Sequence, residues 1–153
     1  MEKKILLVLE AGHGGTGFVD DIYFEDGKQS PDGKFREGDY NRYMSNLLYS
    51  AYEDFSISLH DVEYMPDRVL QLVTDCFDWP VLARRQMIDD IVKRCSYFNV
   101  IHISLHCNAE KTSDWGKARG ARIITRKNAN AESIKLASCL ETSFRNGPYE
   151  DLA

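Results

Sequence analysis

The sequence lacks a hydrophobic run long enough to cross a membrane. Its longest apolar segment near the start is residues 5–9, whereas a transmembrane helix needs about 20 apolar residues. That segment follows only two lysines and precedes no small-residue cleavage site, so it also differs from a secretory signal peptide. We therefore expect neither a membrane span nor a signal peptide in the chain as given.

The chain also lacks an excess of basic charge. It has 19 Lys and Arg against 24 Asp and Glu, which gives a formal net charge of −5. Nucleic acid binding needs a basic surface, and so does a polybasic membrane anchor. The charge balance argues against both as the main partner.

Paired cysteines are absent as well. The four cysteines are scattered, and no two form a CxxC pair: Cys76, Cys95, Cys107 and Cys139. This spacing excludes a zinc ribbon and a thioredoxin motif. We expect four reduced thiols that are mostly buried.

Short apolar segments predict the strands of a sheet. Residues 4–9 and 100–105 are continuous apolar runs, typical of buried parallel strands. Residues 120–125 predict a further strand, and a weaker alternation over residues 56–64 predicts another. Residues 18–24, together with a following Asp-Gly pair, indicate a small exposed hairpin.

Three segments have apolar residues at helical spacing, which predicts amphipathic helices over residues 37–54, 82–94 and 131–144. The segment 66–79 has no clear pattern. Alternating strands and helices predict an α/β fold, with a mostly parallel twisted sheet flanked by helices in a single domain of residues 1–153. The last helix is expected to turn four apolar residues inward: Ile134, Leu136, Ala137 and Leu140.

Polar residues with metal-binding side chains follow the two strongest strands. His13 follows the first, within a glycine-rich segment, and His106 follows the second. Functional crevices of open α/β sheets lie beyond the carboxyl ends of the strands, so the two histidines can converge there. Glu37 begins the first long helix after a polar loop. Two His and one Glu are the ligands of a catalytic zinc site whose fourth position is left for water.

A zinc-bound histidine usually needs an outer hydrogen-bond partner to fix its ring. Glu10, Asp39 and Asn108 are near the ligands in sequence and are the candidates for this role. His102 is not a candidate ligand. It lies four residues before His106 in one predicted strand, so the two are about 13 Å apart. We expect His102 and His60 to be sheet residues.

Each of these residues also has a simpler interpretation, which the spacing alone does not exclude. A histidine after a strand is often only a polar loop residue, and a glutamate at a helix start complements the helix dipole. A glycine-rich loop can instead bind phosphate. However, Ala-Gly-His-Gly-Gly-Thr-Gly lacks both the Gly-x-Gly-x-x-Gly spacing and the Walker Lys-Ser/Thr pair.

Taken together, the motifs resemble the zinc-dependent N-acetylmuramoyl-L-alanine amidases of bacteria and phages, and the similarity covers almost the whole chain. Two departures concern Glu10-Ala11, where the family commonly has Asp-Pro, and Asp90, where it often has Asn. The matching segments are Gly12-His13-Gly14-Gly15 after the first strand, Glu37-x-Asp39-x-Asn41 at the helix start, Leu82-x-x-Arg85, Ser104-x-His106-x-Asn108-Ala109 and the strand at 120–125.

The resemblance implies Zn²⁺ bound by His13, Glu37 and His106. It also implies cleavage of the amide between N-acetylmuramic acid and L-alanine in peptidoglycan, at the cell wall or outside the cell. The family's catalytic acid is a Glu on a last strand, and the sequence ends before such a strand. We therefore expect a C-terminally incomplete amidase-like domain. We assign the acid to neither Glu141 nor Glu150, and Glu10 is one conceivable substitute.

Two alternatives differ from an amidase. One is a non-catalytic module that binds zinc and peptidoglycan but lacks the acid. The other is a zinc carboxypeptidase-like hydrolase, although no HxxE pair occurs early in the chain. If the chain is an amidase or a carboxypeptidase-like hydrolase, the polar loop of residues 17–36 is expected to influence its substrate preference.

Overall fold

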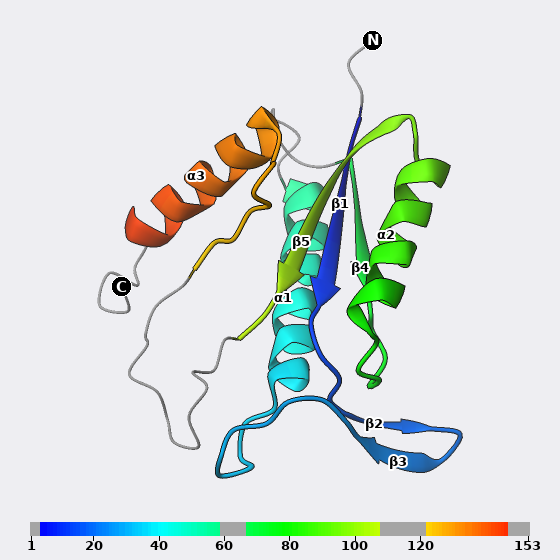
Figure 1. Ribbon diagram of the computed structural model, residues 1–153. Coiled ribbons are helices and arrows are strands. Elements are labelled where there is room, and N and C mark those ends of the chain that lie inside the picture. The colour runs from blue at the N-terminus through cyan, green and yellow to red at the C-terminus, as the bar shows by residue number, and fades with distance from the viewer. Residues whose placement is uncertain (1–3, 59–66, 108–121, 147–153) are drawn as a thin grey trace. The chain divides into compact units, whose positions relative to one another are not determined.

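The computed structural model describes residues 4–58, 67–107 and 122–146 (Figure 1). The chain divides into two compact units, Met1–Ala109 and Glu110–Ala153. The first unit holds a sheet with two helices, and the second holds one helix. In the part of the chain that is described, no helix is both long and apolar enough to cross a membrane.

The sheet of the first unit has three parallel strands in the order β4-β1-β5. They are β1 (Lys4–Ala11), β4 (Arg68–Leu72) and β5 (Phe98–Leu105). The central strand β1 is continuously apolar from Ile5 to Leu9, as expected for a strand with neighbours on both sides and helices on both faces. The predicted α/β fold with a parallel sheet is confirmed.

One face of the sheet packs against helix α2 (Val81–Arg94). Leu6 and Val8 of β1 are buried there, and Ile88 and Ile91 of α2 pack against them. Residues two apart on a strand share a face, so Glu10 points to this same side.

The opposite face packs against helix α1 (Glu37–Ser58), which lies behind the strands in Figure 1. Leu9 is fully buried, and Gln71 lies beside it in register on β4. The Gln71 amide donates hydrogen bonds to Ser45 and Asn46 of α1, at 3.2 and 2.7 Å. These contacts fix α1, and therefore its first residue, relative to the strand ends.

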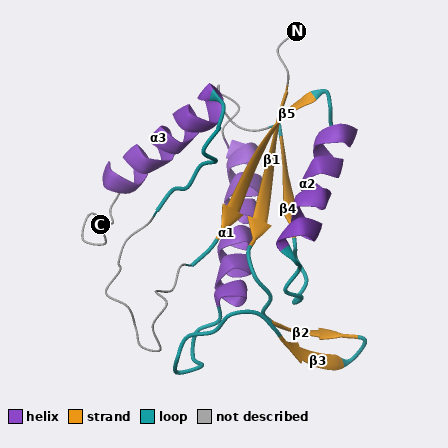
Figure 2. Cartoon of the chain, in the orientation of Figure 1, coloured by secondary structure: helices purple, strands orange, loops and turns teal. Residues whose placement is uncertain are grey.

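A two-stranded hairpin follows β1 and is built from β2 (Thr16–Val19) and β3 (Ile22–Glu25) (Figure 2). Both turn residues, Asp20 and Asp21, have positive φ angles, as a type I′ hairpin turn requires. The predicted exposed hairpin is confirmed.

Two predicted strands are wrong where they can be compared. Helix α1 continues through Ser58, so residues 56–58 are helical, and residues 59–64 lie outside the described part. An established helix gains one hydrogen bond per added residue, whereas a strand needs a partner. The strand is instead β4, in the segment that had no clear pattern. Residues 122–125 form no strand, and residues 120–121 lie outside the described part.

Helix α3 (Ala131–Asn146) of the second unit begins where the sequence predicts. Its first turn is capped by the Asn130 side chain, which accepts a hydrogen bond from the Ser133 N–H at 2.8 Å. No residue of α3 is buried, and Ile134 is 53% exposed. The four residues predicted to face inward are not buried within the described residues of this unit, and the inward face stays a prediction.

All four cysteines are free thiols. Only Cys76 is buried, whereas Cys139 is exposed. The prediction of unpaired thiols is confirmed, and the prediction of mostly buried ones is wrong.

Candidate metal centre

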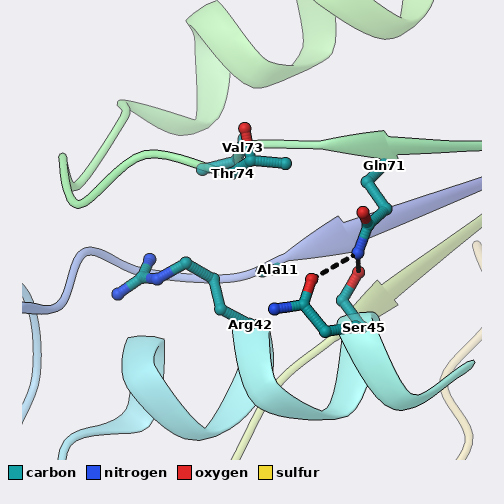
Figure 3. A pocket seen from close by; sticks show the side chains of 7 residues that line it. Ala11, Arg42, Ser45, Gln71, Val73 and Thr74 are labelled. Atoms are coloured by element: carbon teal, nitrogen blue, oxygen red, sulfur yellow. Dashed lines mark hydrogen bonds between the residues drawn. The ribbon is translucent and has the colours of Figure 1, made fainter. Parts of the chain in front are cut away.

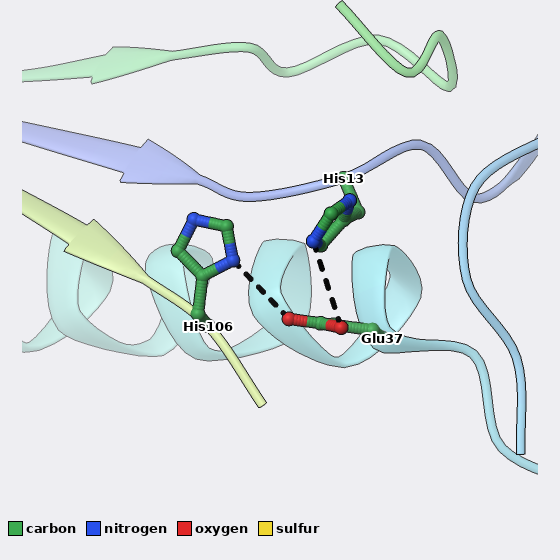
Figure 4. A group of neighbouring side chains, drawn as sticks. All are labelled: His13, Glu37 and His106. Atoms are coloured by element: carbon green, nitrogen blue, oxygen red, sulfur yellow. Dashed lines mark hydrogen bonds and ion pairs between the residues drawn. The ribbon is translucent and has the colours of Figure 1, made fainter. Parts of the chain in front are cut away.

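Three separate elements bring His13, Glu37 and His106 together (Figure 4). His13 lies just beyond the carboxyl end of β1, His106 directly follows β5, and Glu37 is the first residue of α1. One ligand atom of each residue lies within 4.8 Å of the others. The arrangement follows from the sheet, because β1 and β5 are parallel neighbours and end at the same edge.

The distances among the three side chains suit a small metal ion. His13 Nε2 lies 3.7 Å from one Glu37 oxygen, and His106 Nδ1 lies 3.2 Å from the other. The two rings stand nearly perpendicular, with centroids 5.0 Å apart. Tetrahedral zinc with bonds near 2.1 Å would separate its ligand atoms by about 3.4 Å. Two imidazoles and a carboxylate are also the donor types of catalytic zinc sites.

Glu37 is held in the ionised form that binds metal. The side chain is buried, and burial by itself raises the pKa of a carboxyl group. Hydrogen bonds from His106 and from the backbone N–H of Cys107 (2.8 Å), together with the nearby histidine charges, outweigh burial and hold the pKa of Glu37 below its usual value. The Cys107 N–H also fixes the orientation of the carboxylate.

The His106 ring needs the glycine at position 12. A Cβ atom on Gly12 would lie only 2.2 Å from the nearest ring atom of His106, much closer than two carbon atoms can approach. The backbone around Gly12 is itself fixed, since its carbonyl accepts a hydrogen bond from the buried Asn41 side chain at 2.9 Å. One glycine of the first histidine segment therefore makes room for the second histidine.

The residues predicted to orient the histidines have other partners. Asp39 accepts hydrogen bonds from the Thr16 backbone N–H at 2.7 Å and hydroxyl at 3.1 Å, and from Arg42 at 3.0 Å. It therefore ties the hairpin to α1. Asn108 lies outside the described residues. The proposed orienting role of Asp39 has no histidine contact to support it in the described structure.

Glu10 belongs to a buried cluster on the α2 face. Its carboxylate forms an ion pair with Arg84 and a 2.8 Å contact with His102 Nε2. Burial raises the pKa of Glu10, but the His102 hydrogen bond and the Arg84 charge lower it more, so the net pKa is below the usual value. His102 is a sheet residue, as predicted. The arginine that reaches the sheet is Arg84, whereas the Leu-x-x-Arg resemblance pointed to Arg85, which is exposed.

Asp78 is a residue near the centre that the sequence did not single out. Its Oδ1 atom lies 3.5 Å from His13 Nδ1. It falls in the segment 66–79, where no motif or periodicity marks it. Only the path of the loop between β4 and α2 brings it to the histidine.

A small pocket also lies beside the centre, between α1 and the ends of β1 and β4 (Figure 3). Arg42 lines it, but its guanidinium is already engaged with Asp39 and with the Asp75 carbonyl. Ser45 and Gln71 bond to each other across it. Its arginine, serine and glutamine side chains are thus engaged within the protein, and none of its lining residues belongs to the group of His13, Glu37 and His106.

Comparison of the chain with protein-family models, with curated proteins and with solved structures finds no match.

Proposed function

We propose that this chain is a zinc-dependent hydrolase domain in which His13, Glu37 and His106 hold the metal. The observation that carries the proposal is the convergence of these three side chains from β1, α1 and β5, with ligand atoms within 4.8 Å of one another. Residues so far apart in sequence meet by the fold alone, and their donor atoms are those of a catalytic zinc site.

Zinc in such a site polarises a bound carbonyl and lowers the pKa of its water toward neutrality. The chain's own residues would set the geometry. Glu37 contributes one negative charge, and the Cys107 N–H holds its carboxylate in place. His13 and His106 contribute neutral donors from two adjoining strand ends.

For the substrate, we propose the amide between N-acetylmuramic acid and L-alanine in peptidoglycan, which places the site of action at the cell wall. Three of the segments that resemble the amidase family contain the three ligands. Support comes from their position, because the segments chosen by resemblance adjoin one another in space. A zinc ion alone does not select this amide, so the substrate proposal needs its own test.

The general acid is unassigned. Glu10, the conceivable substitute, is bound by Arg84 and His102 on the sheet face opposite α1. Glu141 pairs with Arg145 in the second unit, at 2.8 Å, and Glu150 lies outside the described residues. The engagement of Glu10 favours, as a second candidate, a module that binds zinc and peptidoglycan without hydrolysis.

Zinc content tests the metal site. We expect about one zinc per chain in the native protein by elemental analysis and a sharp fall in His106→Ala, because a three-ligand site loses a donor. His102→Ala is the matched control, since His102 lies on β5, the strand that His106 directly follows, and its side chain contacts Glu10 rather than a proposed ligand in the described structure. A native protein without zinc, even after reconstitution, contradicts the proposal.

Hydrolysis tests the substrate. With zinc bound, we expect purified peptidoglycan to release stem peptides with new N-terminal alanine, and we expect His106→Ala to release none. Zinc-loaded protein that sediments with peptidoglycan but frees no alanine amine would favour the binding module instead.

A further inference from the structure

We propose that Asp78 is a positioning residue for His13: it accepts a hydrogen bond from the Nδ1–H of His13 while Nε2 binds the metal. The inference rests on the proposed zinc site and adds a residue that neither the motifs nor the resemblance identified.

The orientation of the His13 ring carries the first step. Nε2 faces Glu37, at 3.7 Å, and thus the space between the proposed ligands. Nδ1 is on the other side of the ring, is fully buried and has no hydrogen-bond partner among the described residues. Asp78 Oδ1 is 3.5 Å away, slightly longer than a formed N–H···O hydrogen bond of about 2.7–3.2 Å.

The chemistry of imidazole carries the second step. A neutral histidine has one N–H and one lone pair, so a metal on Nε2 places the proton on Nδ1. A buried N–H that lacks a partner is costly, and a carboxylate within reach is the favoured acceptor. Such a carboxylate fixes the tautomer and makes the coordinating nitrogen a better donor.

The loop that carries Asp78 is attached to the loop that carries His13. The Gly15 N–H donates to the Cys76 carbonyl at 3.0 Å, and the Asp78 N–H donates to the Asp26 carboxylate at 3.1 Å. A Cβ at Gly14 would lie 2.6 Å from the Asp78 nitrogen, so the close approach requires glycine at that position.

The other end of this loop is anchored to the sheet. Trp79, next to Asp78, has its carbonyl bound by Arg84 Nε at 3.1 Å. Arg84 is itself buried in an ion pair with Glu10 of β1. The main chain is therefore held on both sides of Asp78, and its carboxylate is presented to His13 from a fixed backbone.

The test measures zinc affinity by competition with a chromogenic chelator in Asp78→Ala and Asp78→Asn. Loss of an outer partner of a metal-bound histidine typically weakens metal binding about 10- to 100-fold, and we expect this for Asp78→Ala. Asp78→Asn keeps an acceptor oxygen of the same shape, so we expect partial retention. Asp89→Ala is the charge-matched control: Asp89 is exposed on α2 and pairs with Arg85 in the described structure, so its removal should leave zinc affinity unchanged.

A spectroscopic signature separates positioning from mere loop stability. In zinc-loaded protein, NMR of ¹⁵N-labelled histidine should show His13 protonated at Nδ1, with a slowly exchanging proton resonance. We expect that resonance to persist in Asp78→Asn and to disappear in Asp78→Ala. If the alanine variant fails to fold, as judged by circular dichroism, the isosteric asparagine variant still gives both readouts. A wild-type protein whose His13 has no protected Nδ1 proton overturns the inference.

The outcomes are distinguishable. A wild-type chain that binds no zinc removes the proposed function and this inference together, before any Asp78 variant is made. A wild type that binds zinc, with Asp78→Ala binding equally well, overturns the inference and leaves the proposed function intact. If Asp78→Ala keeps its zinc affinity but loses hydrolysis, the result also overturns the inference, and it assigns Asp78 to proton transfer.

Discussion

His13 occupies the left-handed region of backbone conformation, with φ of 62°. A residue with a Cβ atom pays roughly 1–2 kcal/mol for that conformation. The surrounding structure maintains it, and the result is that the imidazole faces Glu37 on one side and Asp78 on the other. The strained backbone conformation of His13 is therefore what places its imidazole in the proposed metal site.

This strain predicts a difference between two variants that both lack the imidazole. We expect His13→Gly to be more stable than His13→Ala by about 1 kcal/mol, because glycine adopts positive φ without a Cβ clash. Urea unfolding of the two metal-free variants measures the difference. Equal stability, or a more stable alanine variant, would show that position 13 is not strained.

The three proposed ligands, and the strand edge at which they meet, could be predicted from the sequence because each residue lies at the boundary of a strongly patterned element. His13 and His106 follow apolar strands, and Glu37 begins an amphipathic helix. Asp78 could not be predicted, because its contact with His13 depends on the course of an irregular loop. The partners of Glu10 could not be predicted for a different reason: alternation along β1 turns its side chain to the α2 face, where Arg84 binds it.

Among the elements, α2 depends on a buried charge pair. Arg84 is only 7% exposed and Glu10 only 4%, so each needs the other to offset the loss of water. The pair joins the start of α2 to the central strand, and Arg84 also holds the Trp79 carbonyl.

We expect Arg84→Met to lower the free energy of unfolding by about 3–5 kcal/mol, since it leaves the Glu10 carboxylate buried without its cation. Arg85→Met is the matched control. Its side chain is 64% exposed, so we expect a change within about 0.5 kcal/mol. Urea denaturation of both variants provides the comparison, and similar losses would mean that the pair does not hold α2.

The elements with long, regular patterns are the ones that the sequence predicts well. Both α1 and α2 begin within one residue of the predicted start. Strand β4 has an irregular burial pattern, and it becomes a strand because it pairs with β1 from Leu6↔Arg68 onward. Ile123 and Ile124 have high β propensity but no strand partner in the described structure. Propensity alone therefore predicted a strand that does not form over residues 122–125.

For the whole molecule, the two buried carboxylates make stability depend on pH. Glu10 and Glu37 both have pKa values below the ordinary 4.5 in the folded state. A lowered folded pKa gives stability that is fully present above the unfolded pKa and is lost as pH falls through the folded pKa. The metal-free protein should therefore lose stability below about pH 4.5.

Glu10→Gln isolates one of these contributions. We expect the variant to be less stable than the wild type at neutral pH, with the difference narrowing as pH falls from about 5 to about 3, because the wild type then protonates the same group. Urea unfolding of metal-free protein across this range measures it. A difference that stays constant with pH would mean that Glu10 is not ionised in the folded protein.

The position of β1 at the centre of the sheet has a consequence for how the chain is made. During synthesis β1 emerges before both of its neighbours, and one of them, β5, comes only with residues 98–105. Until then the apolar strand has at least one unpaired edge, a state that favours aggregation. Long-range parallel pairing also slows folding. Recovery of soluble protein should consequently depend on how quickly the distant strand arrives and on whether a chaperone shields the first one meanwhile.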